Sequence, residues 1–203
     1  MPRGCAATSR RLIAGIIAAL GTFGPAAPPA TAQAEPHRVT VPSIPGMTDR
    51  FALKTTAGHD VTEASFPGKW LVIYFGYTLC PDACPTALNA MAGALGELGP
   101  LAVKVQPLFI TVDPQRDTPQ TLTDYVKAFD RRILGLSGTD AQTAAAAKAF
   151  HVYYAVRKLG NDEYAIDHSS FIYIVNPAGQ VVELLTGNLP AHSMAAALRD
   201  LIR

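Results

Sequence analysis

The sequence of 203 residues lacks the features that characterise several classes of protein. It contains only three cysteines, which excludes a small secreted scaffold held together by many disulfides. Its 17 basic and 16 acidic residues nearly cancel and no basic patch stands out, so nothing indicates nucleic-acid binding. It has no internal repeat, and low complexity is confined to the first 34 residues. The length is typical of one ordinary domain.

The first 34 residues resemble an export signal. Arg3, Arg10 and Arg11 form a positive start, Leu12 to Phe23 is apolar, and 32–34 read Ala-Gln-Ala, a typical cleavage pattern. The paired arginines also resemble a twin-arginine signal. An uncleaved membrane anchor is the alternative, although the apolar stretch is shorter than the ~20 residues that span a bilayer. We predict a signal peptide or anchor over 1–34, an extended arm or linker over 35–47, and a folded domain over 48–203.

The folded part alternates apolar runs with segments of helical pattern. We expect strands at 70–75, 103–112, 133–136, 171–175 and 181–185, helices at 86–98, 119–129, 140–150 and 194–202, and hairpins at 51–62 and 152–166. Thr118 can cap the second helix, with Pro119 at its first position, and Thr139 or Asp140 can cap the third. Strand–helix units followed by a strand hairpin and a last helix indicate a mixed α/β protein. The order fits a thioredoxin-like fold: a mixed central sheet flanked by helices, with an N-terminal hairpin and a second hairpin inserted before His168.

Two cysteines, Cys80 and Cys84, lie between the first central strand and the first main helix, and each is followed by proline. Pro85 is typical of a first helical position, so we expect Cys84 at the helix start, where partial positive charge favours its thiolate. The pair could close into a disulfide or bind a soft metal such as copper(I). A disulfide that encloses three residues would stabilise the fold little. We therefore interpret the pair as functional; Cys5 lies in the leader.

A candidate third ligand is His168, in the segment Asp167 to Ser170 just ahead of the strand 171–175. In a thioredoxin-like sheet the loop before that strand faces the cysteine turn, so Cys80, Cys84 and His168 could assemble into one site. A lone histidine is more often a hydrogen-bonded surface or core residue. The remaining histidines have no predicted path to the cysteine loop; they are His37, His59, His151 and His192.

Three carboxylates lie near this predicted site. Asp113 closes a buried strand at its carboxyl end, where ligand sites of α/β sheets cluster. It could orient the cysteine loop or tune the site by hydrogen bonds around the metal ligands. The alternative is that Asp113 and Asp117 solvate the loop and cap the next helix. We expect Asp82, between the cysteines, to stabilise the turn through its own backbone.

The motifs resemble those of the Sco/SenC family, the copper chaperones of cytochrome c oxidase assembly. The matching pieces are 75–78 (Phe-Gly-Tyr-Thr), 80–85 (Cys-Pro-Asp-Ala-Cys-Pro), 111–114 (Thr-Val-Asp-Pro), 116–119 (Arg-Asp-Thr-Pro) and 167–169 (Asp-His-Ser). The resemblance covers residues 42–203. It implies a thioredoxin-like domain, copper bound by Cys80, Cys84 and His168, a Cys80–Cys84 disulfide in the oxidised form, and a periplasmic or extracytoplasmic location.

The resemblance also implies a task and partners. The protein would deliver copper to, or reduce the cysteines of, the binuclear copper site of the copper-bearing oxidase subunit. We also expect a thiol reductase as a partner, possible attachment to the inner membrane, and a second copper chaperone as the copper donor. Many members keep a membrane anchor, and the Ala-Gln-Ala pattern at 32–34 departs from that.

Two rival functions share the fold. The first is a thiol–disulfide oxidoreductase whose cysteine pair cycles by exchange. Against it, three residues separate the cysteines rather than two, and Ser170, before Phe171, stands where thioredoxins have proline. The second is a peroxidase, for which Thr78, two residues before Cys80, is the only supporting feature. The leading hypothesis is therefore a copper-binding assembly factor and not a turnover enzyme.

Overall fold

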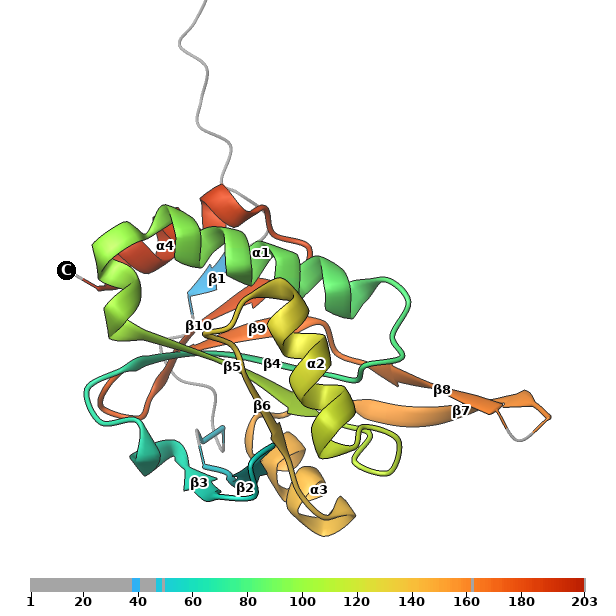
Figure 1. The fold of residues 1–203 in the computed structure, drawn as a ribbon. Coiled ribbons are helices and arrows are strands. Elements are labelled where there is room, and N and C mark those ends of the chain that lie inside the picture. The colour runs from blue at the N-terminus through green and yellow to red at the C-terminus, as the bar shows by residue number, and fades with distance from the viewer. Residues whose placement is uncertain (1–37, 41–46, 49, 162, 203) are drawn as a thin grey trace, which may run out of the picture. The chain divides into compact units, whose positions relative to one another are not determined.

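The computed structural model describes residues 38–40, 47–48, 50–161 and 163–202, and a mixed sheet of eight strands organises them (Figure 1). The strand order is β1-β10-β9-β4-β5-β6-β2-β3. The strands are β1 (Arg38–Thr40), β2 (Ala52–Thr55), β3 (Asp60–Thr62), β4 (Trp70–Gly76), β5 (Val105–Thr111), β6 (Leu134–Ser137), β9 (Phe171–Val175) and β10 (Val181–Thr186). The expected mixed α/β architecture is confirmed.

Strand β4 lies at the centre of this sheet. It pairs parallel with β5 and antiparallel with β9. On one face the ring of Tyr74 packs beside Phe109, and on the other the ring of Phe75 contacts Phe150 and Tyr173. Because both faces are covered, almost every residue of β4 is buried, which explains its unbroken apolar sequence.

Four helices flank the sheet: α1 (Ala83–Glu97), α2 (Pro119–Phe129), α3 (Asp140–Ala149) and α4 (Ala191–Leu201), with short 3-10 helices at Glu63–Ser65 and Gly99–Lys104. Helices α1 and α4 pack together over one face, and α3 lies on the opposite side, next to β2 (Figure 1). Thr118 and Thr139 cap α2 and α3 by accepting hydrogen bonds from the backbone N–H groups of Thr121 and Gln142. The predicted caps are therefore confirmed.

A second, two-stranded sheet carries the histidine predicted as a ligand. Its strands are β7 (Tyr154–Gly160) and β8 (Glu163–His168), and it extends away from the main sheet (Figure 1). Both strands run further than the sequence predicted, so His168 ends a strand instead of lying in a loop. Within the described residues, β7 and β8 pair only with each other. Other contacts must therefore set the position of this hairpin.

Two helices begin three residues earlier than predicted, α1 at Ala83 and α4 at Ala191. Pro85 is therefore the third residue of α1, and Cys84 lies inside the first turn. The first N–H groups of a helix have no intrahelical partner, which is why proline costs little there. Within the predicted arm, Arg38–Thr40 forms β1 and pairs with β10. The predicted leader, 1–34, lies outside the described residues, and none of the helices that the structure describes is long and apolar enough to cross a membrane.

Candidate metal centre

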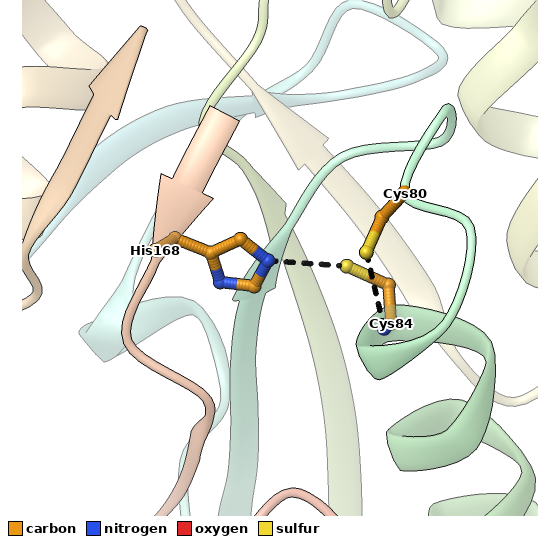
Figure 2. Close-up of side chains that lie close together, drawn as sticks. All are labelled: Cys80, Cys84 and His168. Atoms are coloured by element: carbon orange, nitrogen blue, oxygen red, sulfur yellow. Dashed lines mark hydrogen bonds between the residues drawn. The ribbon is translucent and has the colours of Figure 1, made fainter. Parts of the chain in front are cut away.

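Three side chains that are distant in the sequence meet at one end of the sheet. Cys80 comes from the loop between β4 and α1, Cys84 from the first turn of α1, and His168 from the last residue of β8 (Figure 2). Their sulfur and ring-nitrogen atoms all lie within 4.8 Å of one another. The structure thus brings together the three residues that the sequence suggested.

The imidazole of His168 is oriented toward the sulfurs. Its Nε2 lies 3.4 Å from Sγ of Cys84, while its Nδ1 lies 2.9 Å from the backbone oxygen of Ser169. A protonated Nδ1 would donate to that carbonyl, which leaves the Nε2 lone pair facing Cys84. The rings of Tyr74 and Tyr77 stand edge-on to the imidazole and limit its rotation. The imidazole of His168 is therefore already oriented to bind a metal ion through Nε2.

The two thiols have opposite tendencies to ionise. The hydrogen bond from the Cys84 thiol lowers the pKa of Cys80 to about 3, and the backbone N–H groups of Asp82 and Cys84 add to the effect. The same hydrogen bond and burial raise the pKa of Cys84. The expectation that Cys84 ionises easily is wrong for the metal-free pair, since its sulfur is fully buried and Cys80 takes the charge. Both cysteines are free thiols here, so a Cys80–Cys84 disulfide stays a prediction.

The buried carboxylate of Asp117 holds the cysteine loop. It accepts hydrogen bonds from the backbone N–H and the hydroxyl of Thr78, the latter at 2.6 Å, and from the hydroxyl of Thr111 at 2.6 Å. Thr78 precedes Cys80 by two residues, so Asp117 ties that loop to the end of β5. Burial raises the pKa of Asp117, which these hydrogen bonds partly offset. The sequence left open whether Asp113 orients the cysteine loop, and the structure gives that role to Asp117.

Asp113 instead contacts the hairpin that carries His168. One of its oxygens accepts from Nε of Arg116 at 2.5 Å and the other from the hydroxyl of Tyr164 at 2.9 Å. Tyr164 belongs to β8, the strand that ends in His168. Asp113 therefore supports the histidine side of the site, through a network that the sequence did not reveal.

The other candidates take no part in the cluster. Asp82 stands at the N-cap of α1 without a side-chain capping bond, and its backbone oxygen accepts from Thr86. Among the described histidines, His59, His151 and His192 lie outside the group of metal-ligating side chains. His37 lies outside the described residues.

The donor set decides which ions suit the site. Two sulfurs and one imidazole nitrogen are soft to intermediate ligands, which favour copper and zinc over calcium or magnesium. Cys80 and His168 are half-buried whereas Cys84 is fully buried, so the site is open on the side of Cys80 and His168. An ion held by these atoms would be bound to the protein interior through Cys84 and would be accessible to solvent on the side of Cys80 and His168.

Comparisons with known proteins agree with this geometry. The model of a family described as SCO1/SenC matches residues 43–203. The human mitochondrial SCO1 homolog is 35% identical over 156 residues, which cover 75% of this chain and 52% of the human protein. The copper-bound ScoI structure of Arabidopsis thaliana gives a TM-score of 0.73 at 34% identity and covers 77% of this chain and 98% of that one.

A copper-bound ScoI structure from a bacterium, Bradyrhizobium japonicum, is equally similar, with a TM-score of 0.71 at 36% identity over 76% of this chain and 98% of that one. The expected thioredoxin-like fold is confirmed by these neighbours. The chain spans between about half and three fifths of the length of the first curated relatives it matches.

Proposed function

Because the chain belongs to the SCO1/SenC family, we propose that it binds one copper ion through Cys80, Cys84 and His168 and delivers that copper to the copper-bearing subunit of cytochrome c oxidase during assembly. The observation that carries the proposal is the convergence of the three ligand atoms within 4.8 Å of one another. Copper-bound relatives with the same fold support the choice of metal.

The unequal burial of the ligands suits delivery. Cys84 is fully buried and anchors the ion to α1, whereas Cys80 and His168 border solvent. Ligands of an acceptor protein could approach the ion from that open side and replace the half-buried ligands one at a time. Transfer by ligand exchange avoids a free copper ion at any stage.

A second function rests on the asymmetric ionisation of the cysteines. A Cys80 thiolate can attack a disulfide of the acceptor and form a mixed disulfide, releasing one acceptor thiolate. Cys84 then loses its proton and attacks Sγ of Cys80, which releases the second acceptor thiolate and leaves a Cys80–Cys84 disulfide. Two electrons pass to the acceptor, so a thiol reductase must regenerate the pair. This reaction would prepare the acceptor cysteines to receive copper.

The proposal also covers the location of the protein and its copper donor. We propose a periplasmic or extracytoplasmic location, with residues 1–34 as a signal peptide or inner-membrane anchor and a second copper chaperone as a possible donor. Many of the related proteins are mitochondrial. An extracytoplasmic location would place the cysteines where disulfides form, which is why a reductase partner is part of the proposal.

The first test compares His168→Ala with His59→Ala in the reduced protein. We expect wild-type protein and His59→Ala to bind one copper ion each, with the absorbance of copper(II)–thiolate bands. His59 lies in an exposed turn, and the described structure shows no side-chain hydrogen bond from its ring. We expect His168→Ala to bind at least tenfold more weakly with altered bands, because one ligand of three is lost. Unchanged affinity and bands in His168→Ala would remove His168 from the site.

A further inference from the structure

The hairpin β7–β8 holds one ligand of the site but is not part of the main sheet. Near its base, the N–H of Ser169 donates to the backbone oxygen of Tyr153, and the N–H of Tyr153 donates to the hydroxyl of Ser169. Neither bond joins the hairpin to the sheet that carries the cysteines. Among the described strands β7 and β8 pair only with each other, so side-chain contacts, together with the short link from His168 to β9, set the distance between the hairpin and the cysteine loop.

One face of β8 turns toward the body of the protein. Side chains two residues apart share a face of a strand, so Tyr164, Ile166 and His168 lie on the same side. Tyr164 contacts Asp113, Ile166 is buried, and His168 meets Cys84. Asp167, on the other face, forms an exposed ion pair with Arg157. The inward face of β8 thus carries Tyr164, which anchors the hairpin to the body of the protein, and the candidate ligand His168.

The anchor centres on Arg116. Its Nε donates to Asp113 at 2.5 Å and its Nη1 donates to the backbone oxygen of Tyr164 at 2.8 Å. The guanidinium also lies 3.5 Å from the centre of the Tyr164 ring, a close cation–π contact. Asp113 itself is only 3% exposed and receives the Tyr164 hydroxyl as well. A single side chain therefore binds a buried carboxylate just after the end of β5 and both the backbone and the ring of the hairpin.

Apolar packing also holds the hairpin, since Ile166 belongs to the buried core and Tyr154 and Tyr164 pack against it, but this packing leaves a gap. A cavity of about 320 Å³ lies between the loop after β5 and the hairpin, lined by Asp113, Thr143, Tyr154, Tyr164 and Ile166 among others. Within the described residues the underside of the hairpin is therefore incompletely filled at the level of Tyr164. The hydrogen bond from the hydroxyl of Tyr164 to Asp113 joins two residues that line this cavity.

We propose that Arg116 is a positioning residue for His168: it fixes the hairpin to Asp113 and so sets the distance from the imidazole to the cysteine sulfurs. This inference rests on the proposed copper site. Loss of the anchor leaves the two cysteines in place, since Asp117 holds their loop independently. It loosens the hairpin, which the hydrogen bond from the N–H of Ile166 to the hydroxyl of Tyr77 still joins to the cysteine side, so His168 is held less firmly as a ligand.

The test uses Arg116→Lys, which keeps the positive charge but cannot reach both Asp113 and the backbone of Tyr164 with the planar fork of arginine. We expect copper affinity to fall about tenfold, the size typical of lost support around a metal ligand. The absorption bands should shift toward those of His168→Ala. Tyr164→Phe, which removes only the hydroxyl on Asp113, should shift affinity and bands in the same direction by less.

Arg132→Lys is the matched control. Arg132 also binds a carboxylate, that of Asp130, and a backbone oxygen, that of Leu95, but on a different loop. Its replacement by lysine should leave copper affinity and bands unchanged. An equal loss in Arg132→Lys would show that the effect comes from general destabilisation, and it would overturn the assignment of Arg116.

A double variant tests whether Arg116 affects copper binding through His168. If Arg116 acts through His168, Arg116→Lys has no further effect on copper affinity in the His168→Ala background. A full tenfold loss in that background would overturn the proposal, because Arg116 would then act on the cysteines. In the metal-free protein, amide exchange of β8 should be faster in Arg116→Lys than in wild type. Unchanged exchange also overturns the proposal, whereas failure of wild type to bind copper would count against the proposed function instead.

Discussion

Cys80 and Cys84 are neighbours in space, yet the structure gives them different chemical tasks. Cys84 is fully buried and donates a hydrogen bond to Cys80, whereas Cys80 is half-buried and accepts it. One sulfur therefore carries the charge of the metal-free pair and the other keeps the proton. An incoming metal ion must displace only the proton of Cys84, and an incoming disulfide meets a thiolate that is already formed.

Alkylation of the reduced, metal-free protein tests this difference. With the pKa of Cys80 lowered to about 3, its thiolate is fully formed above pH 5, so its rate with iodoacetamide should stay flat from pH 5 to 8. Cys84, with a raised pKa and no exposed surface, should not react. Mass spectrometry of the cysteine peptides, followed in time at each pH, gives both rates.

Glutathione in the same series is the control. Its thiol has an ordinary pKa near 8.5, so its rate rises about tenfold per pH unit below that value. If the rate of Cys80 follows glutathione, or if Cys84 is modified first, the assignment of the thiolate to Cys80 is wrong.

At the scale of the elements, the end of β4 and the start of α1 form one unit. The strand closes with Gly76, and the first turn of α1 places Cys84 against it. A Cβ at Gly76 would lie 2.6 Å from Sγ of Cys84, 3.0 Å from the ring of Phe109 and 3.1 Å from that of Tyr74. The absence of a side chain at this position therefore lets the helix bring its sulfur onto the sheet.

Gly76→Ala should damage both stability and the site. The added methyl group must displace Cys84 or the two aromatic rings, which we expect to reduce the free energy of unfolding by about 1–3 kcal/mol. It should also weaken copper binding, since Sγ of Cys84 is the nearest atom. Chemical denaturation and copper titration measure the two effects.

Gly96→Ala, near the end of α1, is the matched control. A Cβ there meets no atom within 4 Å, so the substitution should stabilise the protein by about 0.5–1 kcal/mol through helix propensity and leave the copper bands unchanged. Wild-type stability and copper affinity in Gly76→Ala would contradict the close-packing argument.

Local patterns in the sequence were sufficient to predict most of these elements. Residues close together in the sequence determine three of them: the apolar run of β4, the Thr118–Pro119 start of α2 and the strand Phe171–Val175. The start of α1 was misplaced because proline suits any of the first helical positions, so Pro85 does not mark one of them alone.

The supporting network of the site could not be predicted in the same way. Asp117 acts on Thr78 and Thr111, and Arg116 on Tyr164, residues that the fold brings together from different elements. Spacing along the chain contains no signal for such contacts. His168 was identified only because a fold and a family motif placed its loop opposite the cysteines.

At the scale of the whole molecule, the sheet extends beyond the predicted domain boundary at 48. Strand β1 pairs antiparallel with β10, and Arg38, Val39 and Thr40 stand opposite Leu185, Leu184 and Glu183. Without β1, β10 would be an edge strand with unpaired N–H and C=O groups, a common starting point for aggregation. The metal centre lies at the end of β4, on the other side of β9 and β10 in the strand order.

Deletion of residues 1–46 tests whether β1 is part of the domain. Compared with a chain that begins at Glu35, a chain that begins at Met47 should be less stable by about 1 kcal/mol for each lost ladder hydrogen bond. The amides of β10 should exchange faster and aggregation should increase. Copper affinity and bands should stay the same, because β9 and β10 separate β1 from the strand that leads to the cysteines. Equal stability of the two chains would show that β1 contributes nothing, and a loss of copper binding would show that the sheet edge and the metal centre are coupled.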